Sequence, residues 1–322
     1  MKTKIFNSKQ IKQAADLIKK GELVAFPTET VYGLGANALD SNAVKKIFIA
    51  KGRPSDNPLI VHISKKEQIN EIAYIPISKK RLVNKLIKKF WPGPLTIILR
   101  KKKIIPDEVT CGLKTVAIRM PKNKIALSLI ENSKVPIAAP SANLSGKPSG
   151  TSFRHVLKDF NGKIAGIIKS KDCEIGLEST VIDMTADKPM LLRPGLISFE
   201  KLKKIIPKLS LFSCNNLCNN INKVKSPGIK YKHYSPNAKI ILFNTKDFNK
   251  IKIYENKLKK QNKKVKIIKT SKKISFAKKL FKIFRDADEK KIDFLLIQSV
   301  EESGIGRAIM NRLKKASYKI IN

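Results

Sequence analysis

Cysteine is scarce in this sequence and shows neither a metal-binding nor a disulfide pattern. The four cysteines are Cys111, Cys173, Cys214 and Cys218. The last two form a lone CxxxC, which is too little for a structural zinc site. Because disulfide scaffolds belong mainly to small secreted domains, the sequence predicts a reduced cytoplasmic protein with no metal assigned to its side chains.

Long hydrophobic runs are also absent. No apolar stretch approaches the ~18 residues that a membrane-spanning helix requires. The N-terminus is basic, but no apolar segment of the kind found in signal peptides follows it. We therefore expect neither a membrane span nor a membrane partner.

Acidic residues are few, and among the basic residues arginine is rare. The chain has 67 Lys and Arg against 25 Asp and Glu, a formal net charge of +42. Such a charge fits a polyanionic partner such as a nucleotide or RNA. It also fits an A/T-rich genome that fills solvated surfaces with lysine, and we favour this second explanation for most of the charge. Only nine residues are arginine, so Arg53, Arg119 and Arg193, which lie inside motifs, stand out as candidate bidentate donors.

The length and the hydrophobic pattern predict two α/β domains. A chain of 322 residues with 42% hydrophobic content is long enough for two cores. We expect a catalytic domain over 1–206, a linker over 207–237 that folds over the active site, and a small C-terminal domain over 238–322. In the last part three apolar strands alternate with three helical segments, which predicts a small Rossmann-like parallel sheet.

The stretch from Leu23 to Ile63 reads as strand, polar turn, glycine loop, helix, basic corner and strand. Thr28, Glu29 and Thr30 follow the first strand, where open α/β sheets bind ligands. The helix is expected to begin near Asp40 or Ser41 and to end in the corner 51–54.

Ordinary structural roles explain part of this stretch. A lysine, glycine and proline at positions 51, 52 and 54 form a common helix stop, which leaves Arg53 unexplained. In the second strand Leu59, Val61 and Ile63 share one face, and Ile60 and His62 share the other. A lone strand histidine is more often a core residue than a ligand.

A second polar segment, 140–150, has the composition of a phosphate-binding loop. The sequence PSANLSGKPSG offers small hydroxyl residues and glycines that expose backbone N–H groups. It is not a Walker A loop, because Ser141 replaces the first glycine and Pro148 follows the lysine. From composition alone, a surface loop is the favoured interpretation.

Four motifs together resemble the YrdC-like family of threonylcarbamoyl-AMP synthases, in its two-domain form. They are PTETVYGLG with KGRPSDNPLIVHI, then PSANLSGKPS, GLESTVID and LLRPG. The resemblance implies a twisted open mixed sheet with helices, followed by the small C-terminal domain. It also implies roles for individual residues. The catalytic set would be Lys51, Arg53, Ser141 and Asn143. The ATP-binding set would be Arg53, Asn57, Thr115, Ser141, Ser149, Arg193 and Tyr234. The L-threonine-binding set would be Thr30, His62, Arg119, Ala139 and Ser179.

The implied reaction joins L-threonine, bicarbonate or CO2, and ATP into threonylcarbamoyl-AMP and pyrophosphate, with Mg²⁺ entering beside ATP. The product would pass to a transferase that modifies adenosine 37 of ANN-decoding tRNA, and a weak contact with tRNA is possible. Two alternatives stay open: an RNA-binding module of the same fold, and a related enzyme that transfers carbamoyl groups to another acceptor. Pyrophosphate release that requires both threonine and bicarbonate separates the three.

Overall fold

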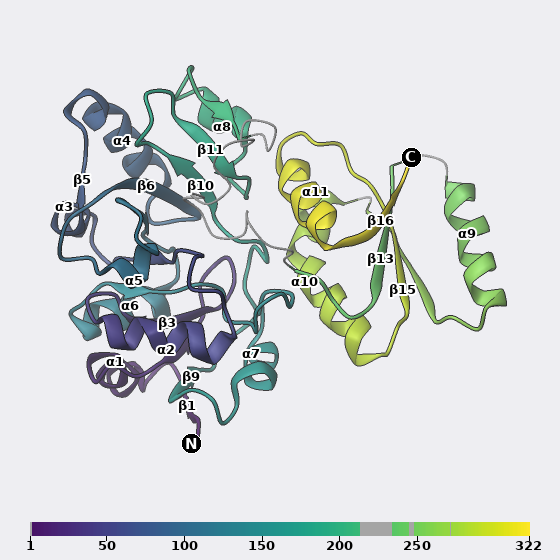
Figure 1. Ribbon diagram of the computed structural model, residues 1–322, viewed down its shortest axis with the longest axis horizontal. Helices are drawn as coiled ribbons and strands as arrows, with labels where there is room; N and C mark the ends of the chain where they lie inside the picture. Colours follow the sequence, from purple (N-terminus) through teal and green to yellow (C-terminus); the bar gives the residue numbers. More distant parts are fainter. Residues whose placement is uncertain (1, 213–233, 245–247, 271) are drawn as a thin grey trace.

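The computed structural model describes residues 2–212, 234–244, 248–270 and 272–322. Within these residues the chain forms a large α/β body and a smaller one beside it (Figure 1). Most of the predicted linker, residues 213–233, lies outside the described part. None of the described helices combines the length and the apolar character needed to cross a lipid bilayer.

The large body is built on a mixed sheet, which confirms the predicted fold class. Twelve strands of the described residues belong to it, and β5 pairs only with β6. Across the sheet the strands are β1 (Lys4–Phe6), β9 (Gly166–Ile168), β2 (Val24–Phe26), β3 (Gly33–Asn37), β8 (Ile137–Ala138), β4 (Ile60–His62), β7 (Thr115–Arg119), β6 (Leu95–Lys101), β10 (Thr180–Asp183), β11 (Met190–Arg193) and β12 (Ser210–Leu211), with β5 at Ala73–Tyr74. Parallel and antiparallel pairs both occur, such as β4 with β7 and β6 with β7.

Helices are distributed along the large body between these strands (Figure 1). They are α1 (Ile11–Lys19), α2 (Ser41–Lys51), a 3₁₀ turn (Lys66–Gln68), α3 (Ile69–Ile72), α4 (Ile77–Phe90), α5 (Asp107–Thr110), α6 (Lys124–Ser133), α7 (Phe153–Phe160) and α8 (Phe199–Lys203). Helix α2 begins as predicted, because Asp40 caps it and accepts hydrogen bonds from the backbone N–H groups of Asn42 and Ala43. It ends as predicted at Gly52, which has a left-handed φ of 57°.

The predicted glycine loop after Thr30 is wrong, because Gly33 and Gly35 belong to strand β3. This strand pairs with β2 on one side and β8 on the other. A Cβ on Gly35 would lie 2.8 Å from both the Phe26 ring and the Ile137 side chain. The glycines therefore let an aromatic ring pack directly on the strand, a role that leaves the backbone extended.

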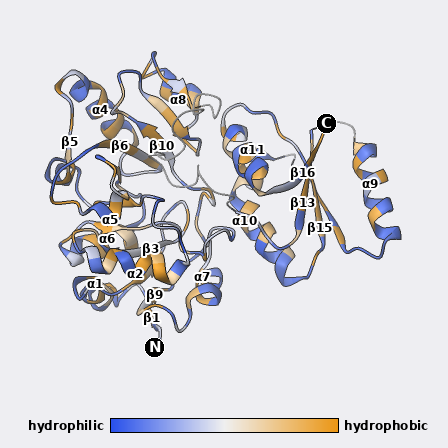
Figure 2. Ribbon diagram, in the orientation of Figure 1, coloured by the Kyte–Doolittle hydropathy of each residue, from blue (hydrophilic) through white to orange (hydrophobic). Residues whose placement is uncertain are grey.

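The two faces of strand β4 divide as predicted. Leu59, Val61 and Ile63 lie in the main hydrophobic core, and Ile60 packs in a smaller cluster on the opposite face. In the hydropathy view, orange predominates at the labelled strands β6 and β10 of the large body (Figure 2). His62 shares the face of Ile60, so the alternation directs it away from the main core.

The small body is a parallel sheet of four strands within the described residues, in the order β14, β15, β13, β16. Its elements are β13 (Lys239–Phe243), α9 (Phe248–Lys260), β14 (Val265–Ile268), α10 (Lys273–Glu289), β15 (Phe294–Gln298), α11 (Ile305–Ala316) and β16 (Ser317–Ile321). Helices α10 and α11 lie on the side of the large body, and α9 lies on the far side (Figure 1).

One hydrophobic cluster crosses from the small body to the large one. Val31 and Leu177 of the large body pack with Tyr234 and with core residues of α10 and α11. At Gly176, whose φ is 74°, a Cβ would lie 2.2 Å from the carbonyl oxygen of Lys278 on α10. The backbones of the two bodies therefore meet here with no space for a side chain.

Candidate functional site

A polar pocket opens where strands β2, β3, β4, β7, β8 and β11 end or begin. Five cationic side chains of the described residues line it, together with one carboxylate. The cations are Lys51, Arg53, Arg119, Lys147 and Arg193, and the carboxylate is Glu178. Such an excess of positive charge suits a polyanionic ligand.

Most of the site residues expected from the sequence line this pocket, although they come from distant parts of the chain. Those in its wall are Thr30, Lys51, Arg53, His62, Arg119, Ala139, Ser141, Asn143, Ser179, Arg193 and Tyr234. Asn57, Thr115 and Ser149 are not part of the wall. Ser149 lies behind it and donates a hydrogen bond of 2.6 Å to Glu178.

Asn57 precedes strand β4, and Thr115 is the first residue of strand β7. The two strands are parallel, with Ile60 paired to Ala117. Asn57 Nδ2 and Thr115 Oγ1 are both buried and have no hydrogen-bond partner in the protein. Buried polar atoms are rarely left unsatisfied, so these two atoms are candidate ligand contacts outside the pocket wall.

Lys51 connects helix α2 to the predicted phosphate-binding loop. Its Nζ donates hydrogen bonds to the carbonyl oxygens of Ser141, at 2.6 Å, and Asn143. In return its carbonyl accepts a bond of 2.8 Å from the backbone N–H of Ser145. Burial, reinforced by the adjacent Arg53, lowers the pKa of Lys51 well below its usual value.

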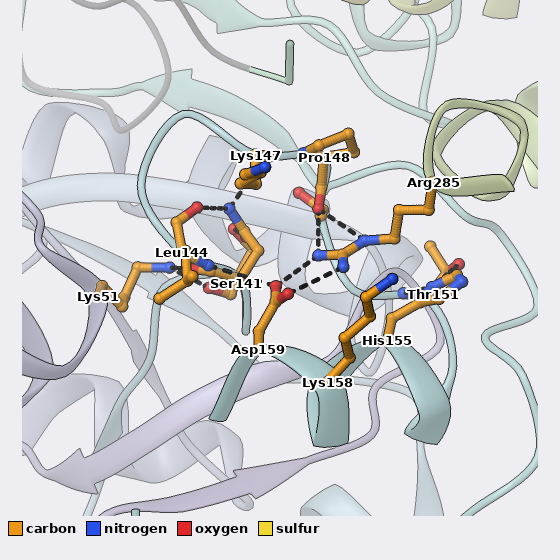
Figure 3. A network of polar contacts seen from close by, with 12 residues as sticks. Lys51, Ser141, Leu144, Lys147, Pro148, Thr151, His155, Lys158, Asp159 and Arg285 are labelled. Carbon is orange, nitrogen blue, oxygen red and sulfur yellow. Dashed lines mark hydrogen bonds and ion pairs between the residues drawn. The ribbon is translucent and has the colours of Figure 1, made fainter. Parts of the chain in front are cut away.

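The loop itself is held by side-chain hydrogen bonds and by an arginine from the small body (Figure 3). Ser141 Oγ donates to Asn143 Oδ1 at 2.6 Å, and Asn143 Nδ2 donates to the carbonyl of Lys147 at 2.9 Å. Arg285 of α10 donates to the carbonyl of Pro148 at 2.6 Å and pairs with Asp159 at 2.7 Å. These bonds fix the backbone of the loop. A solvated surface loop would not need such bonds.

Arg53 follows the helix stop and turns its guanidinium onto the next segment. Its Nη2 donates to the carbonyl oxygens of Asn57, at 2.9 Å, and Pro58, at 3.2 Å. Burial lowers the pKa of Arg53 to about 10, so it remains charged at neutral pH. The remaining N–H groups can meet a ligand in the pocket.

His62 and Arg119 are neighbours on parallel strands β4 and β7. Burial, together with the charge of Arg119, lowers the pKa of His62 to about 3, so the ring is neutral at pH 7. His62 Nδ1 has no hydrogen-bond partner. The pair thus presents a neutral imidazole beside a guanidinium, an arrangement suited to a small molecule with a carboxylate and a polar group.

Arg193 and Ser179 also line the pocket. Arg193 Nε donates to the Ser179 carbonyl at 3.0 Å, and Nη2 donates to the Ser179 hydroxyl at 3.1 Å. That hydroxyl is also 2.7 Å from Thr96 Oγ1. Tyr234, near the end of the predicted linker, lines the pocket and stacks on Phe281 with ring centroids 5.2 Å apart.

Several pocket partners were not assigned from the sequence. Glu29, Lys147 and Glu178 lie within or beside the motifs, and Arg285 and Arg312 belong to the small body. The scarcity of arginine could have identified the last two, since it drew attention to Arg53 by the same argument.

The fold and pocket define a YrdC-like α/β protein extended by a small C-terminal domain. E. coli YciO shares this fold, with a TM-score of 0.54 over 60% of this chain and 96% of its own, at 24% identity. The family model for Sua5, YciO and YrdC, described as telomere recombination, matches residues 16–195. A second model, described as the threonylcarbamoyl-AMP synthase C-terminal domain, matches residues 197–317. The chain belongs to this Sua5/YciO/YrdC family.

Relatives of similar length carry the same two parts. The threonylcarbamoyl-AMP synthase of Pyrococcus abyssi is 49% identical over 97% of this chain and 95% of its own. That of Bacillus subtilis is 44% identical over 97% of this chain and 94% of its own. The crystal structure of P. abyssi Sua5 complexed with L-threonine superimposes with a TM-score of 0.92, covering 99% of both chains at 48% identity.

Proposed function

We propose that this chain is a threonylcarbamoyl-AMP synthase, which makes threonylcarbamoyl-AMP and pyrophosphate from L-threonine, bicarbonate or CO2, and ATP. The observation that carries the proposal is the cationic pocket, in which residues of the loop 140–150 line one cavity together with His62 and Arg119. The similarity to synthases over the whole chain, and to a relative that binds L-threonine, supports the same activity.

The threonine would occupy the corner between β4 and β7. Arg119 supplies a guanidinium for its carboxylate, and His62 and Thr30 supply neutral polar groups. The amine of threonine and bicarbonate would combine to a carbamate with loss of water. Because the carbamate is already an anion, its attack needs no strong general base.

The ATP phosphates would lie along Lys51, Arg53 and Arg193, beside the loop 140–150. One carbamate oxygen attacks the α-phosphorus, the bond from that phosphorus to the bridging oxygen breaks, and pyrophosphate leaves with the electron pair. Phosphoryl transfers of this kind depend on positioning and charge neutralisation, which the buried cations provide. Asn57 and Thr115, with their unpartnered polar atoms, and Ser149, behind Glu178, remain proposed ATP contacts.

Mg²⁺ would enter as part of the nucleotide substrate. Among the described residues, no group of three His, Cys, Asp or Glu side chains could hold a metal ion. The carboxylate in the pocket wall, Glu178, is already bound by Arg312 and Ser149. Phosphate oxygens and water would therefore hold the Mg²⁺, which neutralises phosphate charge.

The product would serve a separate transferase that modifies adenosine 37 of ANN-decoding tRNA, in the cytoplasm. The deciding experiment measures pyrophosphate release from ATP while threonine and bicarbonate are omitted in turn. We expect release only when both are present, and loss of release in Lys51→Ala and Arg53→Ala. Equal release without threonine would refute the proposal, and full activity in both variants would refute the site assignment.

A further inference from the structure

A fully buried arginine of the small body reaches the wall of the nucleotide pocket. Arg312, on α11, has no exposed surface. Its Nε and Nη2 donate to Glu178 Oε2 at 3.1 and 3.0 Å, and its Nη1 donates to the carbonyl of Pro194. The other carboxylate oxygen of Glu178 accepts the hydrogen bond from Ser149.

The negative charge of Glu178 is unfavourable in a pocket that binds polyphosphate. Glu178 lines the same cavity as the five cations, and a bare carboxylate there would repel the phosphate groups. Burial alone would raise its pKa, but Arg312 and Arg193 outweigh that effect and lower it, so Glu178 is ionised at neutral pH. Its charge must therefore be balanced by a neighbouring cation.

Arg312 is the partner that supplies this balance. Its ion pair with Glu178 is sealed from solvent, with side-chain exposures of 0% and 6%. The guanidinium carbon also lies 5.9 Å from the centre of the Tyr234 ring, which lines the pocket.

We propose that Arg312 is a positioning residue of the nucleotide site, which neutralises and orients Glu178 from behind so that the phosphate groups of ATP can bind. This inference rests on the proposed function for the identity of the ligand. It gives the small body a specific task in substrate binding. Arg285 differs, because its partners Asp159 and Pro148 lie outside the pocket wall.

A double-mutant cycle on the full chain tests the inference. The variants are Arg312→Met, Glu178→Gln and the two combined. The matched control is Arg307→Met, because Arg307 also pairs across the two bodies, with Glu200 at 3.3 Å, but is partly exposed and lies outside the pocket wall. ATP affinity is measured by calorimetry, KM for ATP and for threonine by pyrophosphate release, and folding by thermal unfolding.

Arg312→Met is expected to weaken ATP binding about 30-fold, since it leaves a buried anion unpaired beside the phosphates. Glu178→Gln added to it should restore most of the lost affinity, because the repulsion disappears with the charge. KM for threonine should change less than about threefold in Arg312→Met and in the double variant, as in the control. A purely structural role would instead raise both KM values together, and the double variant would not recover.

The outcomes are decisive even when one variant fails to fold. If Arg312→Met is unfolded, the double variant still decides: ATP affinity within about threefold of the unaltered chain supports the inference, and a loss beyond tenfold overturns it. Unchanged ATP affinity in a folded Arg312→Met also overturns it. If the unaltered chain does not bind ATP, both the inference and the proposed function fail, whereas ATP binding without turnover refutes only the function.

Discussion

Arg119 and Glu29 approach to 2.8 Å inside the large body, with 4% of each side chain exposed, yet they do not form a hydrogen bond of good geometry. Arg119 Nη2 and both oxygens of Glu29 have no hydrogen-bond partner, although the charges attract. The guanidinium is thus held to Glu29 as a buried ion pair. A ligand carboxylate bound by Arg119 would share the guanidinium with Glu29.

Replacing Arg119 with lysine should weaken threonine binding. Lysine keeps the charge but loses the planar fork, so a bidentate contact with the carboxylate of threonine is lost. We expect about 2 kcal/mol of lost affinity, about 30-fold, measured by titrating threonine into the protein. ATP affinity serves as the control, and it should stay within threefold. Equal weakening for both ligands would contradict a role specific to threonine.

ATP binding should be accompanied by proton uptake at Lys51. Burial and Arg53 lower the pKa of Lys51, and a polyphosphate placed beside it would raise that pKa again. At a pH between the two values, the amine gains a proton when ATP binds. Titration calorimetry in buffers of different ionisation enthalpy measures this uptake.

The control for this measurement is Lys51→Met, which should bind ATP more weakly and lose the buffer dependence assigned to the amine. If the variant takes up as many protons as the unaltered chain, another group is responsible.

His62 should make the folded state less stable in mild acid. Its folded pKa, about 3, lies below the unfolded value near 6.5, so the unfolded chain binds the proton first as the pH falls. The stability that this neutral ring contributes is full above about pH 6.5 and is lost progressively toward pH 3. Between pH 7 and pH 5 the loss is about 2 kcal/mol, measured by urea unfolding.

The variant His62→Gln isolates this contribution. His155, whose pKa burial lowers to about 4, remains in the variant and produces its own loss. The difference between the two proteins therefore belongs to His62. An identical pH dependence in both would show that His62 is not buried in its neutral form.

Arg285→Met should destabilise the chain by about 3–5 kcal/mol, because it leaves Asp159 as an unpaired buried anion. Urea unfolding measures this change. Adding Asp159→Asn should recover part of the loss, although the carbonyl of Pro148 stays without its arginine donor (Figure 3). A loss below 1 kcal/mol for the single variant would mean that solvent reaches the site.

Local patterns predicted much of the fold, because they reflect local physics. Alternation set the faces of Leu59–Ile63, and Asp40 with Gly52 marked the ends of α2. Gly33 and Gly35 misled the prediction, because the reason for a glycine was the ring of Phe26, which packs against it from another strand. Such a contact leaves no periodic signal.

Prediction of the site from the sequence is limited in the same way, because contacts between distant segments leave no local pattern. Motif residues such as Lys51 and Ser141 could be placed from the sequence, since each motif is continuous. The contact between Glu178 and Arg312 could not be predicted from the sequence, because 134 positions separate the two residues. No pattern on α11 indicates that Arg312 faces a distant loop. Only the packing of the two bodies brings the pair together.

The backbone contact at Gly176 has a consequence for chimaeric proteins. Any side chain at this position would collide with the carbonyl of Lys278, so the fit between the two domains depends on a missing methyl group. A hybrid that borrows its C-terminal half from a relative must preserve this glycine and the path of the α10 backbone as a unit. Matching the surface charges of the two halves would not compensate for a single alanine here.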